Sequence, residues 1–389
     1  MSTSTSRATG LTADLLLHAH GPRLTALRHL HDLTQTDLAG QLGVTQSFLS
    51  QVESGARPAP ETLVVDASAM FNLPLSFFSV EPDESRTGTV TFRKNSRATA
   101  RDENRVVEFY NEASRLFRHA SIASGYHTAR LPDPEDYDHD TERVARAFRQ
   151  AVGLDDVAPL LNATRALERL GVGVVDNLDH LSDEVRGHTA CSRPSPLNDR
   201  PLVALAAAVP GGVKRLTLLH EVGHLIFDRG LMNPIKSTRS PEERRAYKFA
   251  GACLLPPEVV RSRISEGLTL HGYLAIKAEY GITVGAAVMR ARDLGVISEQ
   301  RARSLQIQIS SQGWRTSEPI PVADETPLLL GQALDRAFGK QAAAKASYDV
   351  GTKPEWINTW ARTANVKAGE HKTAEVLDLA SARRNSRRR

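Results

Sequence analysis

The 389-residue sequence contains only two cysteines, Cys191 and Cys253, and no long run of apolar residues. Two cysteines are too few for a disulfide framework, so we expect reduced thiols. No apolar run approaches the length of a bilayer span, and the first ten residues are rich in Ser and Thr rather than charged and then apolar. These absences argue against a disulfide scaffold, a membrane span and a secretion signal, and they predict a cytoplasmic protein.

The charge balance is mildly basic. There are 49 Lys and Arg residues against 45 Asp and Glu, which gives a net charge of +4. This value suits a nucleic-acid-binding protein but does not establish one. The length is sufficient for two domains and their connections.

The most informative segment is His-Glu-Val-Gly-His at residues 220–224. Apolar residues around it predict a buried helix over 215–227. Residues four apart lie on one face of a helix, so His220 and His224 can bind a single metal ion. Glu221 lies one step round the helix, where its carboxylate can act on water without occupying a coordination position. The segment predicts a zinc hydrolase site, and the alternative is a surface helix with two ordinary histidines.

A catalytic zinc ion usually has three protein ligands and one open position. Downstream, Ser240 as N-cap and Pro241 in the first turn predict a second helix. Its first turn carries Glu242 and Glu243, on opposite edges of the apolar stripe that follows. Either carboxylate is a candidate third ligand, and either also suits the positive end of the helix dipole. Spacing alone therefore does not choose between them.

These two helices resemble the ImmA/IrrE family of zinc metallopeptidases. The family pattern is H-E-x-G-H followed by E-x-x-A-[ND]-x-F-A-x-x-L-L-x-P, and the chain matches the second part at Glu243, Ala246, Phe249, Ala250, Leu254 and Pro256. The similarity extends to residues 157–175 and 280–290. The resemblance implies a zincin-like fold with one Zn²⁺ per chain. It also implies Glu221 as general base and three zinc ligands, which are His220, His224 and Glu243.

The departure that matters is Tyr247, which stands where the family has Asn or Asp. That position is expected to support the ligands rather than to bind the metal. The substitution is therefore expected to affect metal affinity or the reaction rate, and not the fold.

A second informative region lies near the N-terminus. The pattern predicts helices over 24–31, 33–43 and 44–55, with Thr45 as an N-cap and Gly55 as a C-terminal stop. Two short helices joined by a turn containing Gly form the helix-turn-helix layout.

This region resembles the Xre/Cro-type DNA-binding domain. The resemblance implies that Gln35 contacts phosphate and that the third helix reads bases in the major groove. The side chains expected on its outward face are Gln46, Ser47, Ser50 and Gln51. The alternative is a helical bundle used only for protein contacts.

The expected fold is mainly α with a small β-sheet: an all-α helix-turn-helix domain, then an α+β zincin-like domain. The expected order is a flexible leader (1–20), the DNA-binding domain (21–80), a linker with a charged helix (81–138), the peptidase domain (139–299) and a C-terminal extension with a basic tail (300–389). In the linker, a solvated helix face is expected to carry Arg97, Arg101, Arg105 and Arg115, and the alternative is that these arginines contact DNA or acidic partners.

Residues 172–175, 185–190 and 201–209 predict a small sheet in the peptidase domain. The apolar run 202–209 should be buried on both faces, and a turn at Gly211-Gly212 should lead into the zinc-motif helix. His188 and His271 are expected to be structural or surface residues.

We therefore expect a DNA-binding transcriptional regulator with a zinc metallopeptidase domain that cleaves a repressor protein. Its expected partners are double-stranded operator DNA and the repressor, with a homodimer on palindromic DNA as an open expectation. One alternative is a transcription factor whose zincin fold serves as a sensor or dimerisation module without proteolysis. Another is antitoxin-like autoregulation through the DNA-binding domain.

Overall fold

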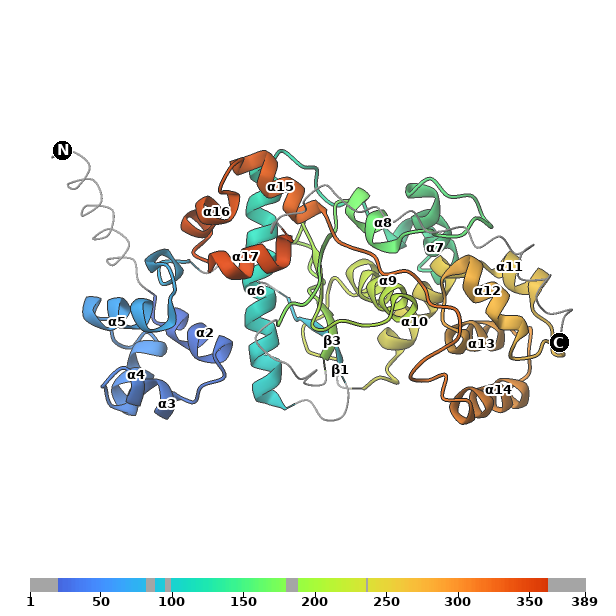
Figure 1. Cartoon of the computed structure of the whole chain (residues 1–389), viewed down its shortest axis with the longest axis horizontal. Helices are drawn as coiled ribbons and strands as arrows, with labels where there is room; N and C mark the ends of the chain where they lie inside the picture. The colour runs from blue at the N-terminus through green and yellow to red at the C-terminus, as the bar shows by residue number, and fades with distance from the viewer. Residues whose placement is uncertain (1–19, 82–87, 95–98, 180–187, 236, 363–389) are drawn as a thin grey trace, which may run out of the picture.

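The computed structural model describes residues 20–81, 88–94, 99–179, 188–235 and 237–362. The expected leader up to residue 19, Arg97, residues 185–187 and the basic tail lie outside this part of the chain. The described residues form a small N-terminal helical domain and a larger, mainly helical body around a small sheet, as expected (Figure 1). No helix among them is long and apolar enough to cross a membrane.

The N-terminal domain contains the helices that the sequence predicts. Thr34 and Thr45 cap two of them, because their hydroxyls accept hydrogen bonds from the backbone N–H of the third residue beyond. Gly55 has φ +74°, a conformation that favours glycine, and follows the end of the third predicted helix. The elements are α2 (Pro22–Leu30), α3 (Gln35–Gln41), α4 (Gln46–Glu53), α5 (Glu61–Phe71) and the 3₁₀ helix η1 (Leu75–Phe77).

The sheet has four strands in the order β1-β3-β4-β2. These are β1 (Thr91–Lys94), β3 (His188–Ser192), β4 (Leu202–Leu205) and β2 (Gly173–Val175). β2 runs parallel to β4, whereas β3 is antiparallel to both β4 and β1. The last three match the predicted strand regions, although β4 ends earlier than expected. β1 was not predicted, and it comes from the segment expected to be a linker.

The sheet separates two hydrophobic cores. In β4, Val203 and Leu205 pack into one core while Leu202 and Ala204 pack into the other. This alternation follows from the two-residue period of a strand, and it confirms burial on both faces for β4. The prediction is wrong for residues 207–209, which are partly or fully exposed. Cys191 of β3 is buried, and its thiol is free.

One core lies between the sheet and the helices that follow it. Its helices are α7 (Thr141–Ala151), α8 (Ala163–Arg169), α9 (Gly211–Phe227), α10 (Pro241–Leu254), α11 (Pro257–Arg263), α12 (Gly272–Tyr280), α13 (Val284–Asp293) and α14 (Glu299–Ser311). The predicted turn at Gly211-Gly212 is wrong, because both glycines belong to α9. A Cβ on Gly211 would lie 2.5 Å from the carbonyl oxygens of Val322 and Ala323, so glycine here permits a close approach of the chain.

The other core is organised around α6 (Ala100–Ala123), the long upright helix left of centre in Figure 1. It packs against α2 on one side and against the sheet and the C-terminal helices on others. The expected solvated arginine face is wrong for two of its residues. Arg105 donates to both carboxylate oxygens of buried Asp179 at 2.7 and 2.8 Å, and Arg115 pairs with buried Glu112. Neighbours enclose the helix on several sides, so these guanidinium groups meet carboxylates rather than water.

The C-terminal extension completes this second core. Trp356 and Trp360 are buried, and the indole N–H of Trp360 donates to the carbonyl of Leu178 at 3.1 Å. Before these helices, the Glu325 carboxylate accepts hydrogen bonds from the first backbone N–H groups of α8. The helices are α15 (Leu329–Phe338), α16 (Ala342–Val350) and α17 (Pro354–Ala361).

Candidate functional site

Helix α9 places two imidazoles of the motif on one buried face. His220 and His224 are 0% and 1% exposed, and their Nε2 atoms face each other at 3.1 Å. They meet because residues four apart stack on the same side of a helix. Burial of two imidazoles is unfavourable unless their nitrogens find polar or metal partners. This face of α9 therefore requires a third polar group.

Helix α10 supplies that group. Ser240 accepts a hydrogen bond from the backbone N–H of Glu243 and so begins the helix as predicted. The carboxylate oxygens of Glu243 lie 3.4 Å from Nε2 of His220 and 3.4 Å from Nε2 of His224. Glu242, the alternative that spacing left open, is outside this cluster. The structure thus brings together the three residues that the family resemblance implies.

The site depends on a close crossing of α9 and α10. A Cβ on Gly223 would lie 3.0 Å from Cα of Ala246, which is tighter than ordinary contact. Glycine in the motif therefore lets the two helix backbones approach at this point. Since Ala246 is one turn beyond Glu243, this approach carries the carboxylate to the two imidazoles.

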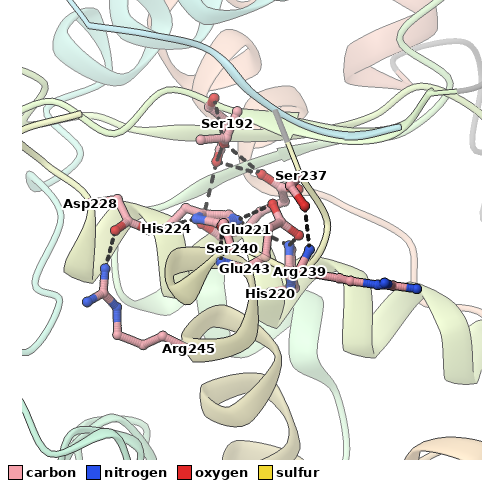
Figure 2. Close-up of polar contacts among 11 residues, drawn as sticks. Ser192, His220, Glu221, His224, Asp228, Ser237, Arg239, Ser240, Glu243 and Arg245 are labelled. Atoms are coloured by element: carbon pink, nitrogen blue, oxygen red, sulfur yellow. Dashed lines mark hydrogen bonds and ion pairs between the residues drawn. The ribbon is translucent and has the colours of Figure 1, made fainter. Parts of the chain in front are cut away.

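Polar contacts orient His224 from behind (Figure 2). Its Nδ1 lies 2.7 Å from Oδ2 of Asp228, and Asp228 also pairs with Arg245. Such a carboxylate fixes the tautomer and leaves Nε2 directed into the site. Burial lowers the pKa of His224, but hydrogen bonds with Asp228 and Glu243 outweigh it and raise the pKa to about 10.

The pKa of the Glu243 carboxyl is shifted in the opposite direction to that of His224. Burial raises its pKa, but hydrogen bonds and charge interactions with His220 and His224 dominate and lower the pKa to about 2. An ionised carboxylate facing two basic nitrogens attracts positive charge, either as protons or as a metal cation.

His220 is oriented differently. Its ring lies against the ring of Tyr247, with centroids 4.2 Å apart. Its buried Nδ1 has no hydrogen-bond partner within the described ranges. Tyr247, which stands where the family has Asn or Asp, thus packs its ring on this histidine.

The three donor groups fit a zinc ion. Ligand atoms about 2.0–2.1 Å from a tetrahedral zinc lie roughly 3.3 Å from one another. The nitrogen–nitrogen distance of 3.1 Å and the nitrogen–oxygen distances of 3.4 Å match such edges. Two imidazoles and one carboxylate suit zinc and leave a fourth position open, whereas calcium and magnesium prefer sites made of oxygen atoms.

Glu221 lies beside this cluster and is fully buried. Its Oε2 accepts hydrogen bonds from Ser192 Oγ at 2.7 Å and from Thr91 Oγ1 at 3.1 Å. Its Oε1 has no hydrogen-bond partner in the part of the chain that the structure describes. One carboxylate oxygen is thus held by the sheet, while the other makes no hydrogen bond with the described residues.

Three residues that contact the site were not predicted from the sequence. Asp228 lies four residues after His224 on the same helix face, a spacing that offered a usable signal. Thr91 and Ser192 come from β1 and β3, far away in sequence from Glu221, and no local pattern marks them. His271 packs against Trp314 with ring centroids 5.7 Å apart, away from the ligand cluster.

The predicted DNA-contacting residues lie on the outer side of the N-terminal domain. Gln46, Ser47 and Gln51 of α4 are exposed, and Ser50 is partly exposed. Nε2 of Gln46 donates to Oε1 of Gln35 at 2.6 Å. Helices α3 and α4 lie on the side of this domain away from the C-terminal helices (Figure 1).

Comparisons with known proteins agree with this architecture. Residues 167–292 match the family model for the IrrE N-terminal-like domain, Peptidase_M78, and residues 21–74 match a model for a helix-turn-helix domain. No curated protein matches the chain. The resemblance seen in the sequence is confirmed for both parts and in the same order. The two matches define a DNA-binding regulator with a metallopeptidase-like domain.

The crossing of α9 and α10 can be tested with Gly223→Ala. The added side chain would collide with Ala246, so we expect the free energy of unfolding to fall by about 1–3 kcal/mol in urea titrations. Gly251→Ala is the matched control, because its Cβ would lie 3.4 Å from Cδ of Arg290, which is an ordinary van der Waals contact. The control should be neutral or stabilising, and an equal loss in both variants would contradict a special close approach at Gly223.

Proposed function

We propose that this protein is a DNA-binding transcriptional regulator whose second domain is a zinc metallopeptidase that cleaves a repressor protein at a specific site. The observation that carries the proposal is the convergence of His220, His224 and Glu243 beside buried Glu221. The matches to a helix-turn-helix domain and an IrrE N-terminal-like domain support the two halves of the proposal.

In this proposal His220, His224 and Glu243 hold the zinc ion. Bound there, zinc acts as a Lewis acid on a peptide carbonyl and makes water nucleophilic near neutral pH. Asp228 maintains the orientation of His224, and the ring of Tyr247 maintains that of His220.

Glu221 is the proton carrier of the proposed reaction. Its Oε1 takes a proton from the attacking water and returns it to the nitrogen of the leaving amine. The hydroxyl of Ser192 in β3 keeps Oε2 in place through its hydrogen bond, so the carboxylate cannot rotate freely. This restraint keeps Oε1 as the reactive atom.

A second candidate function is regulation without proteolysis, in which the zincin fold serves as a sensor or dimerisation module. The observation that favours it is the closed site, since Glu221 and His220 are both 0% exposed. In that case the metal would stabilise the fold and Glu221 would be dispensable.

The assignment of the third ligand predicts the metal content of two neighbouring variants. Wild type and Glu242→Gln should each purify with one zinc per chain by elemental mass spectrometry. Glu243→Gln removes a ligand oxygen, so its zinc affinity in a chelator competition should fall beyond the roughly 10–100-fold typical of an outer-shell change. Equal affinities in both variants would exclude Glu243 as a ligand.

The proposed catalysis predicts a separation of metal binding from cleavage. Glu221→Gln should retain zinc, because its carboxylate lies outside the ligand set, but its cleavage rate should fall by about 10²–10⁴-fold. Sequencing of protein N-termini in cells expressing wild type or variant would reveal the cut. We expect a helix-turn-helix repressor with a new N-terminus only in the wild type. Zinc in both proteins with identical N-termini would favour regulation without proteolysis.

The proposed DNA interface predicts a sequence-dependent defect. Gln51→Ala should weaken binding to an operator selected from random DNA by about 1–3 kcal/mol, because an amide contact to a base edge is lost. Binding to unselected DNA should change little. Gln332→Ala, an exposed position on α15, is the control for altered surface polarity. Loss on both kinds of DNA would assign Gln51 to the phosphate backbone instead.

A further inference from the structure

The candidate peptidase site is closed in this structure. His220, Glu221, His224 and Glu243 are between 0% and 5% exposed. A site that cuts a protein must admit an extended stretch of chain, and extended peptides commonly bind by adding a strand to the edge of a sheet. The sheet edge nearest to Glu221 is therefore the candidate binding edge for a peptide that enters the site.

That edge is covered by β1. The strand pairs antiparallel with β3 through Thr91↔Ser192, Phe92↔Cys191 and Arg93↔Ala190. It lies outside the peptidase match, which begins at residue 167, and comes from the segment that follows the DNA-binding domain. β3 and β4 belong to the matched region, so β1 is an addition to the edge of its sheet.

The first residue of β1 reaches the catalytic carboxylate. Thr91 Oγ1 donates to Glu221 Oε2 at 3.1 Å and also lies 2.9 Å from Ser192 Oγ. The Thr91 side chain is 1% exposed, so β1 closes the sheet over Glu221. A peptide paired with the same edge of β3 would have to occupy the position of these residues.

The attachment of β1 is limited in extent. The strand has four residues, and its register with β3 shifts between Arg93 and Lys94. At its entrance, a Cβ on Gly88 would lie 2.7 Å from the carbonyl oxygen of Pro194, so the chain there passes close to the end of β3. A short ladder of this kind can be exchanged for another strand without loss of the remaining sheet.

We propose that the outer edge of β3 is the docking edge for an extended peptide substrate, and that β1 is an internal strand that occupies this edge. The inference rests on the proposed peptidase function. Cleavage then requires β1 to leave β3, and the chain controls its own site through this strand.

A reversible lock tests the inference. Phe92→Cys places a thiol opposite Cys191 in the antiparallel ladder, at a spacing that a disulfide can bridge. Oxidation with diamide should lock β1 onto β3, and reduction should release it. Phe92→Cys with Cys191→Ser is the matched control that cannot lock. Val90→Asp, which puts a charge at a buried position before β1, should weaken its attachment.

The probe is a fluorescein-labelled peptide with the sequence of residues 88–96, whose binding is followed by fluorescence polarisation. We expect Val90→Asp to bind it with at least tenfold lower Kd than wild type. The oxidised Phe92→Cys protein should show no binding, and reduction should restore the wild-type value. Equal binding by the oxidised and reduced proteins, or binding by none of the proteins, would overturn the inference.

Cleavage of a proteome-derived peptide library by the zinc-loaded proteins separates this inference from the proposed function. Cleavage should follow the same order as binding: greatest for Val90→Asp, lower for wild type and absent for the locked protein. If peptide binding follows this order but none of the proteins cuts the library, the peptidase proposal fails while the docking edge stands. If the locked and reduced proteins cut equally, β1 does not cover the substrate edge.

Discussion

The close approach of α9 and α10 at Gly223 and Ala246 determines the geometry of the candidate site. It places the carboxylate of Glu243 against two imidazoles in a buried region of the protein. Such a cluster is tolerated only when charges and hydrogen bonds balance, because an unpaired buried ion is strongly destabilising. The neighbouring pair of Asp228 and Arg245 extends this balance outward. Packing and electrostatics therefore act together here, and neither alone would hold the three donors in place.

The segment between the two matched domains is part of the folded body. Arg23 of α2 pairs with buried Glu112 of α6 at 2.9 Å, and Glu112 also accepts a hydrogen bond from Thr352. Tyr110 of the same helix donates to the carbonyl of Leu202 in β4 at 2.9 Å. Helix α6 thereby connects the DNA-binding domain, the sheet and the C-terminal extension through buried polar contacts. A buried ion pair of this kind also disfavours other arrangements of the domains, since separation would leave a charge without its partner.

Local patterns in the sequence were sufficient for the helices that carry function. Thr45 and Ser240 mark helix starts through side-chain caps, and the histidine spacing in α9 places two imidazoles on one face. Local patterns could not decide whether Glu242 or Glu243 is the third ligand, because the answer depends on how α10 crosses α9. Family resemblance supplied that choice before the geometry did.

The errors share one physical cause, which is contact between segments far apart in sequence. Gly211 resembles a turn residue, yet it begins a helix because another segment approaches it closely. Arg105 resembles a solvated residue, yet Asp179 neutralises it in the core. Thr91 lies in a segment without a clear pattern, and its role arises only from strand pairing with β3. Neither the hydrophobic periodicity of a segment nor a helix-capping residue encodes such contacts.

The two cores do not coincide with the two matched domains. One core joins the DNA-binding helices to α6 and to α15, α16 and α17, and a Cβ on Gly351 would lie 2.6 Å from the carbonyl oxygen of Ser76. Domains generally fold as units while the chain emerges from the ribosome. Here the N-terminal half cannot complete its core until residues 329–361 have been made. The DNA-binding domain therefore reaches its final packing last during synthesis, after the metallopeptidase-like part has been translated.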